Sequence, residues 1–258
     1  MPGPILIFDS GVGGLSVVPP LRHRLPDAAL VYACDNAMLP YGTRPDGWLV
    51  ERILAVCDAA VAASGCCVLV VACNTASTLA LDALRAHLTV PVVGTVPAIK
   101  PAAAMSASRH IGLLATSATV TRPYTDRLIE TFAADCRVTR VAADLLVREA
   151  ERLLAGDEPD RAVIRAVMQP LSSEPDLDTV VLGCTHFPLL GERLAAAFPR
   201  PIRLVDSSDA IARRTVEVAR GPASRLGRDQ SLATAPGAGL ARAMATFGFG
   251  EPSLLIVG

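Results

Sequence analysis

The stretches LVVACNTAS (residues 69–77) and VVLGCTHFP (residues 180–188) share one pattern: an apolar run, a small residue, a cysteine, and a polar cluster that contains threonine. The apolar runs are rich in β-branched residues and too short for helices, which predicts buried strands of parallel sheet. IFDSGVGG (7–14) and LLATSATV (113–120) echo each other more loosely at nearly the same separation. Chance similarity between short strands is the alternative. The matching separations favour two related α/β halves.

Each of these four runs ends in small polar residues and is followed by a helix-like stretch. Ligands of parallel α/β sheets bind outside the carboxyl ends of the strands, so we expect the four polar clusters to face one cleft. The clusters are Asp9-Ser10-Gly11, Cys73-Asn74-Thr75, Thr116-Ser117 and Cys184-Thr185-His186.

The predicted fold class is α/β, with two similar domains of largely parallel sheet related by a pseudo-twofold axis and an active site in the cleft between them. PVVGTVPAIKPAA (91–103) contains three prolines and is typical of a crossover between the halves. The C-terminal tail, with LLIVG as a closing strand, is expected to return to the first half. The first domain would then comprise residues 1–97 and 208–258 and carry Cys73, and the second would comprise residues 98–207 and carry Cys184.

Composition argues against several classes of protein. The net charge is −1 without a basic cluster, which argues against nucleic-acid binding. No apolar run approaches the roughly 18 residues of a membrane helix, and the start MPGPILIFDS lacks the basic residues of a secretory signal. We therefore expect a cytoplasmic protein that binds a small molecule.

Cofactor and metal chemistry have few candidate residues. Lys100 is the single lysine and lies between prolines, so the Schiff base of a pyridoxal-phosphate enzyme has one weak candidate. The seven cysteines form no C-x-x-C pair, their number is odd, and the four histidines are scattered, so neither a disulfide framework nor a zinc site is expected. The sequence predicts an enzyme without a metal or a cofactor.

Cys73 and Cys184 are the candidate reactive residues. Each follows a predicted buried strand at the start of a predicted helix, where backbone N–H groups are expected to lower the thiol pKa from its usual value near 8.5. One such cysteine is more often structural, and the other five are assigned that role. Two at equivalent positions could place thiols on opposite sides of one carbon, which a two-base inversion of that carbon requires.

Asp9 and His186 are candidate auxiliary bases, each beside one cysteine. A strand-end aspartate is more often a helix cap, and a lone histidine is more often a satisfied polar residue, so only their pairing with the cysteines favours catalysis. Proton abstraction from an amino-acid Cα also needs hydrogen-bond donors near the carboxylate. The candidate donors are Ser10, Asn74, Thr75 and Thr185.

DSGVGG (9–14) and PYG (40–42) are predicted to be loops of the site. The first is not a dinucleotide fingerprint, because Ser16 occupies the position of its third glycine. Its glycines would permit a tight turn and a close approach of the backbone to an anionic ligand. Tyr41 and Gly42 would offer a hydroxyl and bare backbone for a lid or a carboxylate contact, and a plain turn is the alternative.

The sequence closely resembles the glutamate racemase family. The motifs FDSGVGGLSV, PYGTR, VVACNTAST, PVVGTVPAIKPA, LLAT, VVLGCTHFPLL and LVDSSDAIARRT occur in family order from Ile5 to about Thr215. The resemblance implies two α/β domains and cofactor-independent racemisation in which Cys73 acts on D-glutamate and Cys184 on L-glutamate. It also implies a role in supplying D-glutamate for peptidoglycan, and a homodimer.

Positions that match the family's substrate-binding or thiol-assisting residues are Asp9, Ser10, Tyr41, Gly42, Asn74, Thr75, Thr116, Thr185 and His186. Many relatives carry Cys-Pro ahead of an acidic residue that assists catalysis. Here that stretch reads AADLLVREAE, which leaves Glu151 as the first counterpart and Glu149 as its rival. Two other functions stay open: a racemase of aspartate or another small amino acid, and a family member that inhibits DNA gyrase without catalysis.

Overall fold

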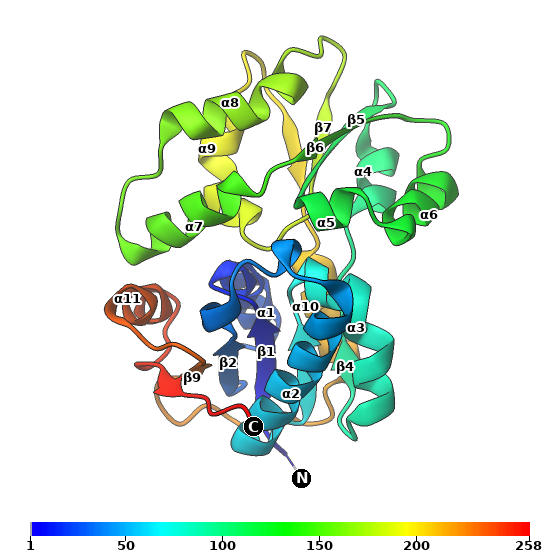
Figure 1. Ribbon diagram of the computed structural model, residues 1–258. Helices are drawn as coiled ribbons and strands as arrows, with labels where there is room; N and C mark the ends of the chain where they lie inside the picture. Colours follow the sequence, from blue (N-terminus) through cyan, green and yellow to red (C-terminus); the bar gives the residue numbers. More distant parts are fainter. Residues whose placement is uncertain (1) are drawn as a thin grey trace.

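Two parallel β-sheets, one in each of two lobes, organise the chain in the computed structural model, which describes residues 2–258 (Figure 1). The first sheet has the strand order β10-β9-β2-β1-β3-β4 and the second has the order β6-β5-β7-β8. Every strand pairing in both sheets is parallel, which confirms the predicted α/β class.

The first sheet and the helices around it form the lower lobe of Figure 1. Its strands are β1 (Ile5–Asp9), β2 (Leu30–Cys34), β3 (Val68–Val71), β4 (Val92–Val93), β9 (Gln230–Ala233) and β10 (Ser253–Leu254). Its helices are η1 (Gly13–Val17), α1 (Val18–Arg24), η2 (Asn36–Met38), η3 (Tyr41–Thr43), α2 (Asp46–Ser64), α3 (Asn74–His87), α10 (Ser208–Val218) and α11 (Ala238–Thr246).

The second sheet lies in the upper lobe. Its strands are β5 (His110–Ala115), β6 (Arg137–Ala142), β7 (Thr179–Leu182) and β8 (Arg203–Val205). Its helices are α4 (Ile99–Met105), α5 (Ser117–Val120), α6 (Pro123–Phe132), α7 (Leu145–Ala155), α8 (Arg161–Ser172), η4 (Phe187–Leu190) and α9 (Gly191–Ala195).

The same strand order recurs in the two lobes. The run β2-β1-β3-β4 of the first sheet corresponds to β6-β5-β7-β8 of the second, so β1 matches β5 and β3 matches β7. These are the strands that carry the two pairs of echoed motifs. Since β1, β3, β5 and β7 are interior strands of parallel sheets, the polar residues after them gather at the carboxyl edges.

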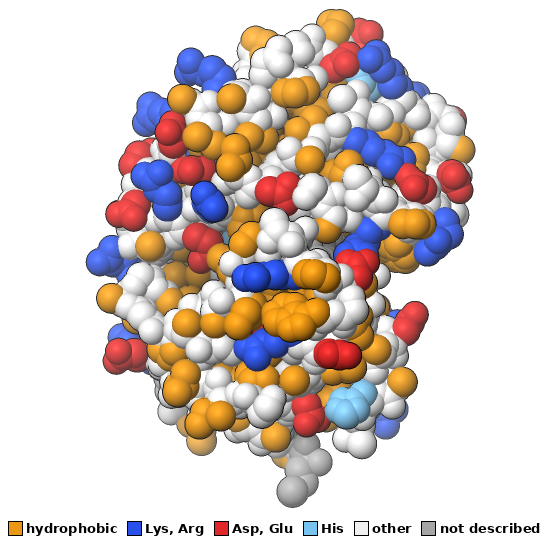
Figure 2. All heavy atoms as spheres, viewed as in Figure 1, with side chains coloured by type: hydrophobic (Ala, Val, Ile, Leu, Met, Phe, Trp, Pro, Cys, Tyr) orange, Lys and Arg blue, Asp and Glu red, His pale blue; other side chains and the backbone are white. Residues whose placement is uncertain are grey.

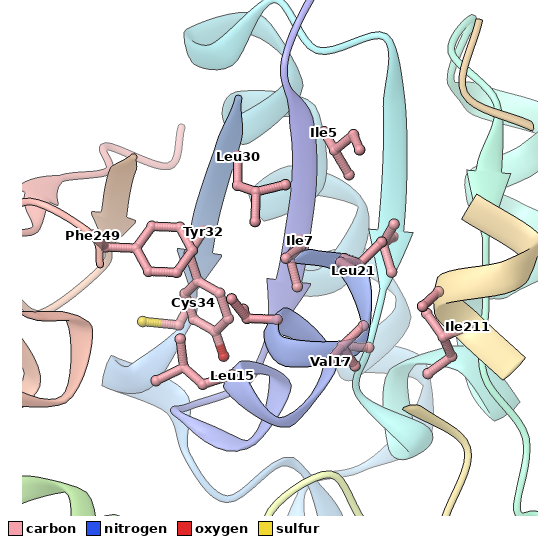
Figure 3. Close-up of a cluster of buried hydrophobic side chains, with 14 of the residues drawn as sticks. Ile5, Ile7, Leu15, Val17, Leu21, Leu30, Tyr32, Cys34, Ile211 and Phe249 are labelled. Carbon is pink, nitrogen blue, oxygen red and sulfur yellow. The ribbon is translucent and has the colours of Figure 1, made fainter. Parts of the chain in front are cut away.

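Strand β1 is apolar from Ile5 to Phe8 because helices cover both faces of its sheet. Ile5 and Ile7 point into the cluster that includes α1 and α10 residues, whereas Leu6 and Phe8 point into the cluster beneath α2 and α3. Figure 3 shows the first cluster, in which the Tyr32 and Phe249 rings meet edge to face at 5.8 Å between centroids. This two-sided burial fixes the register of the central strands.

The chain passes from one lobe to the other before α4 and again before α10. Ile99 on α4 packs in the second lobe, and Ile211 on α10 packs in the first. We propose domain boundaries at these crossings, which gives residues 1–97 with 208–258 and residues 98–207. The predicted closing strand is shorter than expected, because only Ser253–Leu254 pairs with β9 and Ile256 is 78% exposed.

The face of the molecule seen in Figure 2 shows no dominant charge. Acidic and basic side chains are interspersed over the face seen in Figure 2, as expected for a net charge of −1. Within residues 2–258, none of the helices combines the length and the apolar character needed to span a membrane.

Replacing Ile7 by Ala should lower the free energy of unfolding by about 2–5 kcal/mol, because this fully buried side chain lies in the central strand. Ile256→Ala is the matched control and should change the same free energy by less than about 0.5 kcal/mol. Urea unfolding followed by circular dichroism measures both. Equal losses for the two variants would contradict the assigned core.

Candidate active site

A small cavity lies where the carboxyl edges of the two sheets face each other. Ten of the eleven predicted site residues line it: Ser10, Tyr41, Gly42, Cys73, Asn74, Thr75, Thr116, Cys184, Thr185 and His186. The eleventh, Asp9, is completely buried and bonded to Thr185, which lines the cavity. The structure therefore brings the whole predicted set together.

Four further residues complete the wall and were not identified from the sequence: Leu39, Pro40, Val147 and Gly183. Gly183 precedes Cys184, and a Cβ at this position would lie 2.9 Å from Ala115 Cβ on the neighbouring strand. Val147 is on α7, in a stretch where the sequence carries only the helical periodicity of a packed face. That periodicity gives no sign of a cavity wall.

Cys73 forms the N-cap of α3, directly after β3. Its Sγ lies 3.7 Å from Ser10 Oγ. Burial raises the pKa of the Cys73 thiol to about 12, with a further increase from Asp9, while the Ala76 N–H and Ser10 lower it. The expectation of a lowered pKa is thus wrong for Cys73, because the loss of hydration outweighs the helix N-terminus.

Asp9 ends β1 and joins the lobes. Its Oδ2 accepts a hydrogen bond from Thr185 Oγ1 at 2.9 Å, and its Oδ1 accepts one from the Gly11 N–H at 3.0 Å. Burial raises the carboxyl pKa of Asp9, although the charge of His186 opposes this shift. The following helix η1 has no side-chain cap, so the helix-cap interpretation of Asp9 is wrong.

Cys184 follows β7 and contacts a histidine–glutamate pair. Its Sγ lies 3.7 Å from His186 Nδ1, and His186 Nε2 lies 2.8 Å from Glu151 Oε1. Burial lowers the pKa of His186, but its hydrogen bonds to Cys184 and Glu151 raise that pKa well above the ordinary value. These two contacts therefore favour the protonated form of His186.

The choice between the two glutamates of α7 is resolved by their contacts. Glu151 Oε1 accepts a hydrogen bond from the Val12 N–H at 2.8 Å as well as contacting His186. Glu149 Oε2 instead accepts one from the Asp160 N–H at 2.6 Å, at the start of α8. Glu151 thus belongs to the site, and Glu149 orders the connection to the next helix.

The glycines of the DSGVGG turn permit a close approach of protein side chains from the opposite lobe. A Cβ at Gly11 would lie 2.2 Å from Glu151 Oε1. One at Gly13 would lie 2.5 Å from both His186 Nδ1 and Thr185 Oγ1. Neither glycine has a positive φ, so the backbone conformation does not require glycine at these positions. Glycine is needed because a Cβ would collide with side chains of the opposite lobe.

The remaining polar residues differ in how they are engaged. Asn74 Oδ1 is buried without a hydrogen-bond partner, so this atom remains available to a ligand. Thr116 Oγ1 donates to Thr119 Oγ1 at 3.1 Å. The Tyr41 hydroxyl donates to Asp35 at 2.8 Å, so the expected contact of this hydroxyl with a substrate carboxylate is wrong.

Two thiols thus reach one cavity from opposite lobes, each with a different partner. Cys73 lies beside the hydroxyl of Ser10, and Cys184 lies beside the cationic His186. An acid and a base on two sides of a bound carbon can remove a proton from one face and return a proton to the other. No group of three or more potential ligand side chains arranged for a metal occurs in residues 2–258.

Comparisons with known proteins agree with this arrangement. A model of the Asp/Glu/hydantoin racemase family matches residues 16–215. Glutamate racemase of Shewanella loihica is 46% identical over 248 residues, which make up 95% of this chain and 93% of that protein.

Solved structures give the same result. The crystal structure of Escherichia coli glutamate racemase in complex with L-glutamate and the activator UDP-MurNAc-ala has a TM-score of 0.94 and 42% identity, with 100% of both chains covered. Glutamate racemase from Thermus thermophilus in complex with β-chloro-D-alanine has a TM-score of 0.77 and 32% identity, with 99% of this chain and 97% of that one covered. The similarity therefore extends over both lobes.

Replacing Gly13 by Ala should reduce kcat/KM by about 10²-fold or more, because the new methyl group displaces His186 and Thr185. Gly47→Ala, where a Cβ meets nothing within 4 Å, is the control and should keep the activity of the parent chain. Steady-state kinetics measures both. Full activity in the Gly13 variant would show that the lobes do not meet at this turn.

His186 should remain protonated at pH 7.5, where an ordinary histidine is mostly neutral. Ring ¹⁵N chemical shifts report its protonation. Glu151→Gln removes a carboxylate that raises this pKa, so His186 should lose its proton at lower pH in that variant.

Because the folded-state pKa is raised, the resulting stabilisation is full below the unfolded pKa of about 6.5 and is lost as pH rises through the folded pKa. A neutral His186 at pH 7.5 in the parent chain would refute the assignment of the cation.

Proposed function

This chain belongs to the Asp/Glu/hydantoin racemase family, and from that premise we propose that it interconverts L- and D-glutamate, with Cys73 and Cys184 as the two proton-transferring groups. The observation that carries the proposal is the convergence of these two thiols, one from each lobe, on a single polar cavity. Glutamate as the substrate is supported by the relatives, which match this chain over nearly its whole length.

The proposed reaction transfers one proton at each face of Cα. With L-glutamate, the Cys184 thiolate takes the Cα proton and becomes a thiol, and the electron pair stays on the substrate. The Cys73 thiol then gives its proton to the opposite face and becomes a thiolate. The reverse direction, from D- to L-glutamate, starts with Cys73 as the thiolate and Cys184 as the thiol.

The two surroundings suit these roles. The cationic His186 balances the negative charge of a thiolate at Cys184. Burial raises the pKa of Cys73 to about 12, which favours its neutral, proton-donating form at the start of the L-to-D direction. Ser10 is the group proposed to assist Cys73 when it becomes charged, through the contact of its hydroxyl with the sulfur, and Asp9 is the base proposed to help deprotonate this thiol before the D-to-L direction.

The electron pair left on the substrate after proton removal needs nearby hydrogen-bond donors. Asn74 and Thr75 stand at the N-terminus of α3, where the backbone N–H groups of the first turn have no partner within the helix. Thr185 lines the cavity from the other lobe, but its hydroxyl already donates to Asp9. We propose that Asn74, Thr75 and these N–H groups hold the substrate carboxylate and stabilise the charge that develops on it.

The proposal requires no cofactor. Lys100, the single lysine, is on α4, and its ammonium group lies 5.3 Å from the centroid of the Phe132 ring rather than in the cavity. No lysine is therefore available at this cavity for a Schiff base. The proposed enzyme works in the cytoplasm as a homodimer and supplies D-glutamate for peptidoglycan.

The test is proton NMR of L-glutamate and of D-glutamate in D2O with purified protein and no added cofactor. The parent chain should exchange the Cα proton and form the other enantiomer. Cys73→Ala and Cys184→Ala should each lower racemisation by several orders of magnitude, since either change removes one of the two proton carriers. The control is Cys136→Ala, a cysteine outside the cavity, which should keep full activity.

Normal racemisation by either single variant would exclude the two-thiol mechanism. Aspartate tested in parallel decides the substrate, because sequence likeness does not measure discrimination of a single methylene, which is worth about 1–3 kcal/mol. Faster turnover of aspartate than of glutamate would overturn the proposed substrate while leaving the mechanism in place.

A further inference from the structure

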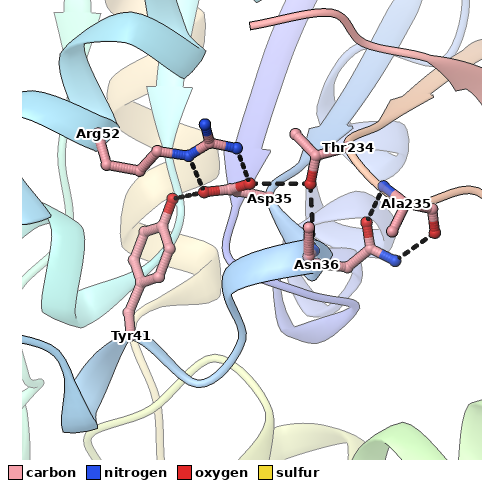
Figure 4. Close-up of polar contacts among 7 residues, drawn as sticks. Asp35, Asn36, Tyr41, Arg52, Thr234 and Ala235 are labelled. Carbon is pink, nitrogen blue, oxygen red and sulfur yellow. Dashed lines mark hydrogen bonds and ion pairs between the residues drawn. The ribbon is translucent and has the colours of Figure 1, made fainter.

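The loop that carries Tyr41 and Gly42 is fixed from behind by a buried polar cluster (Figure 4). Its centre is Asp35, which follows β2 and has no exposed surface. The carboxylate of Asp35 accepts hydrogen bonds from the Tyr41 hydroxyl at 2.8 Å and from Thr234 Oγ1 at 2.8 Å. Arg52 on α2 donates from Nε and from a terminal nitrogen at 2.9 and 2.7 Å.

A second set of bonds ties the same loop to the C-terminal segment. Asn36 Nδ2 donates to the Ala235 carbonyl at 2.7 Å, and the Ala235 N–H donates to Asn36 Oδ1 at 3.0 Å. The Ala37 N–H donates to Thr234 Oγ1 at 3.1 Å. Residues 35–37 are thus held by residues 234–235, which follow β9 and come from the far end of the sequence.

None of Asp35, Arg52 and Thr234 lines the substrate cavity, whereas Tyr41 and Gly42 do. The Tyr41 ring packs against Phe8 at 6.5 Å between centroids, which fixes its other side. Gly42 faces the opposite lobe, since a Cβ there would lie 3.4 Å from Thr116 Cβ. The position of this wall of the cavity therefore depends on the buried cluster behind it.

We propose that Asp35, Arg52 and Thr234 are positioning residues that set the place of the Tyr41–Gly42 wall and so the affinity for the substrate. The inference rests on the proposed function for its kinetic test. A bidentate arginine–carboxylate pair fixes the orientation of the carboxylate as well as attracting it. The carboxylate can then hold the tyrosine hydroxyl in one position. The reacting thiols lie on other elements, so the cluster acts on binding rather than on proton transfer.

Thr234→Val removes one of the four bonds to Asp35, together with the bond from the Ala37 N–H, and leaves the cavity wall chemically unchanged. We expect KM to rise about fivefold, as the loss of one hydrogen bond to a charged group allows, with kcat changed by less than about twofold. Thr246→Val is the matched control, because Thr246 is exposed and donates only to the Arg242 carbonyl of its own helix. Its KM and kcat should equal those of the parent chain.

Tyr41→Phe should likewise raise KM about fivefold, and the double variant should raise KM by less than the product of the two single effects, because both changes act through Asp35. Arg52→Lys keeps the positive charge but loses the paired hydrogen bonds of the guanidinium group to Asp35. It should therefore raise KM less than a neutral replacement of Arg52. A lowered kcat with unchanged KM in the Thr234 variant, or multiplicative effects in the double variant, would overturn the proposal.

Hydrogen–deuterium exchange of the ligand-free protein provides a test that does not depend on the substrate. Thr234→Val should speed exchange in peptides covering residues 36–44 and leave residues 110–130 of the other lobe unchanged. Unchanged exchange in residues 36–44 would overturn the positioning role. If the parent chain fails to racemise glutamate but exchange in residues 36–44 responds, the proposed function fails and the positioning role stands.

Discussion

The approach of two parallel sheets, with their carboxyl edges facing each other, is the constraint on which the rest of this structure depends. Interior strands β1, β3, β5 and β7 each end in polar residues at that edge. Neither lobe encloses the cavity alone, because Cys73 comes from one and Cys184 from the other. Two hydrogen bonds cross between the lobes at the site, from Thr185 to Asp9 and from the Val12 N–H to Glu151. They hold the lobes together and also form part of the site.

The topological repeat does not extend to the electrostatics. Cys73 and Cys184 occupy matching places after matching strands, yet one lies near a carboxylate and a hydroxyl and the other lies beside a histidine–glutamate pair. Burial raises the pKa of Cys73 to about 12, while the hydrogen bonds to Cys184 and Glu151 raise the pKa of His186. In the proposed mechanism each thiol acts as the acid in one direction and as the base in the other, so the two thiols do not need the same surroundings.

Packing at the site is close enough that small residues become obligatory. Gly11 and Gly13 lie against Glu151, His186 and Thr185 with no room for a Cβ, so the turn after β1 serves as a contact surface between the lobes. The C-terminal segment contributes indirectly, through Thr234 and Asp35, to the wall formed by Tyr41. Residues far apart in sequence thus determine the position of the cavity walls, although few of them line the cavity.

The sequence by itself determined the α/β class, the strands, the two cysteines and the residues beside them, because strand periodicity and strand-end polarity are local properties of the chain. It could not choose between Glu151 and Glu149, which lie two residues apart on one helix and differ in what the opposite lobe presents to them. It also misjudged the pKa of Cys73 and the partner of the Tyr41 hydroxyl. Burial decides the pKa of Cys73, and side-chain contacts made in the folded chain decide the other two features, one of them between residues 139 positions apart; only the tertiary structure supplies both.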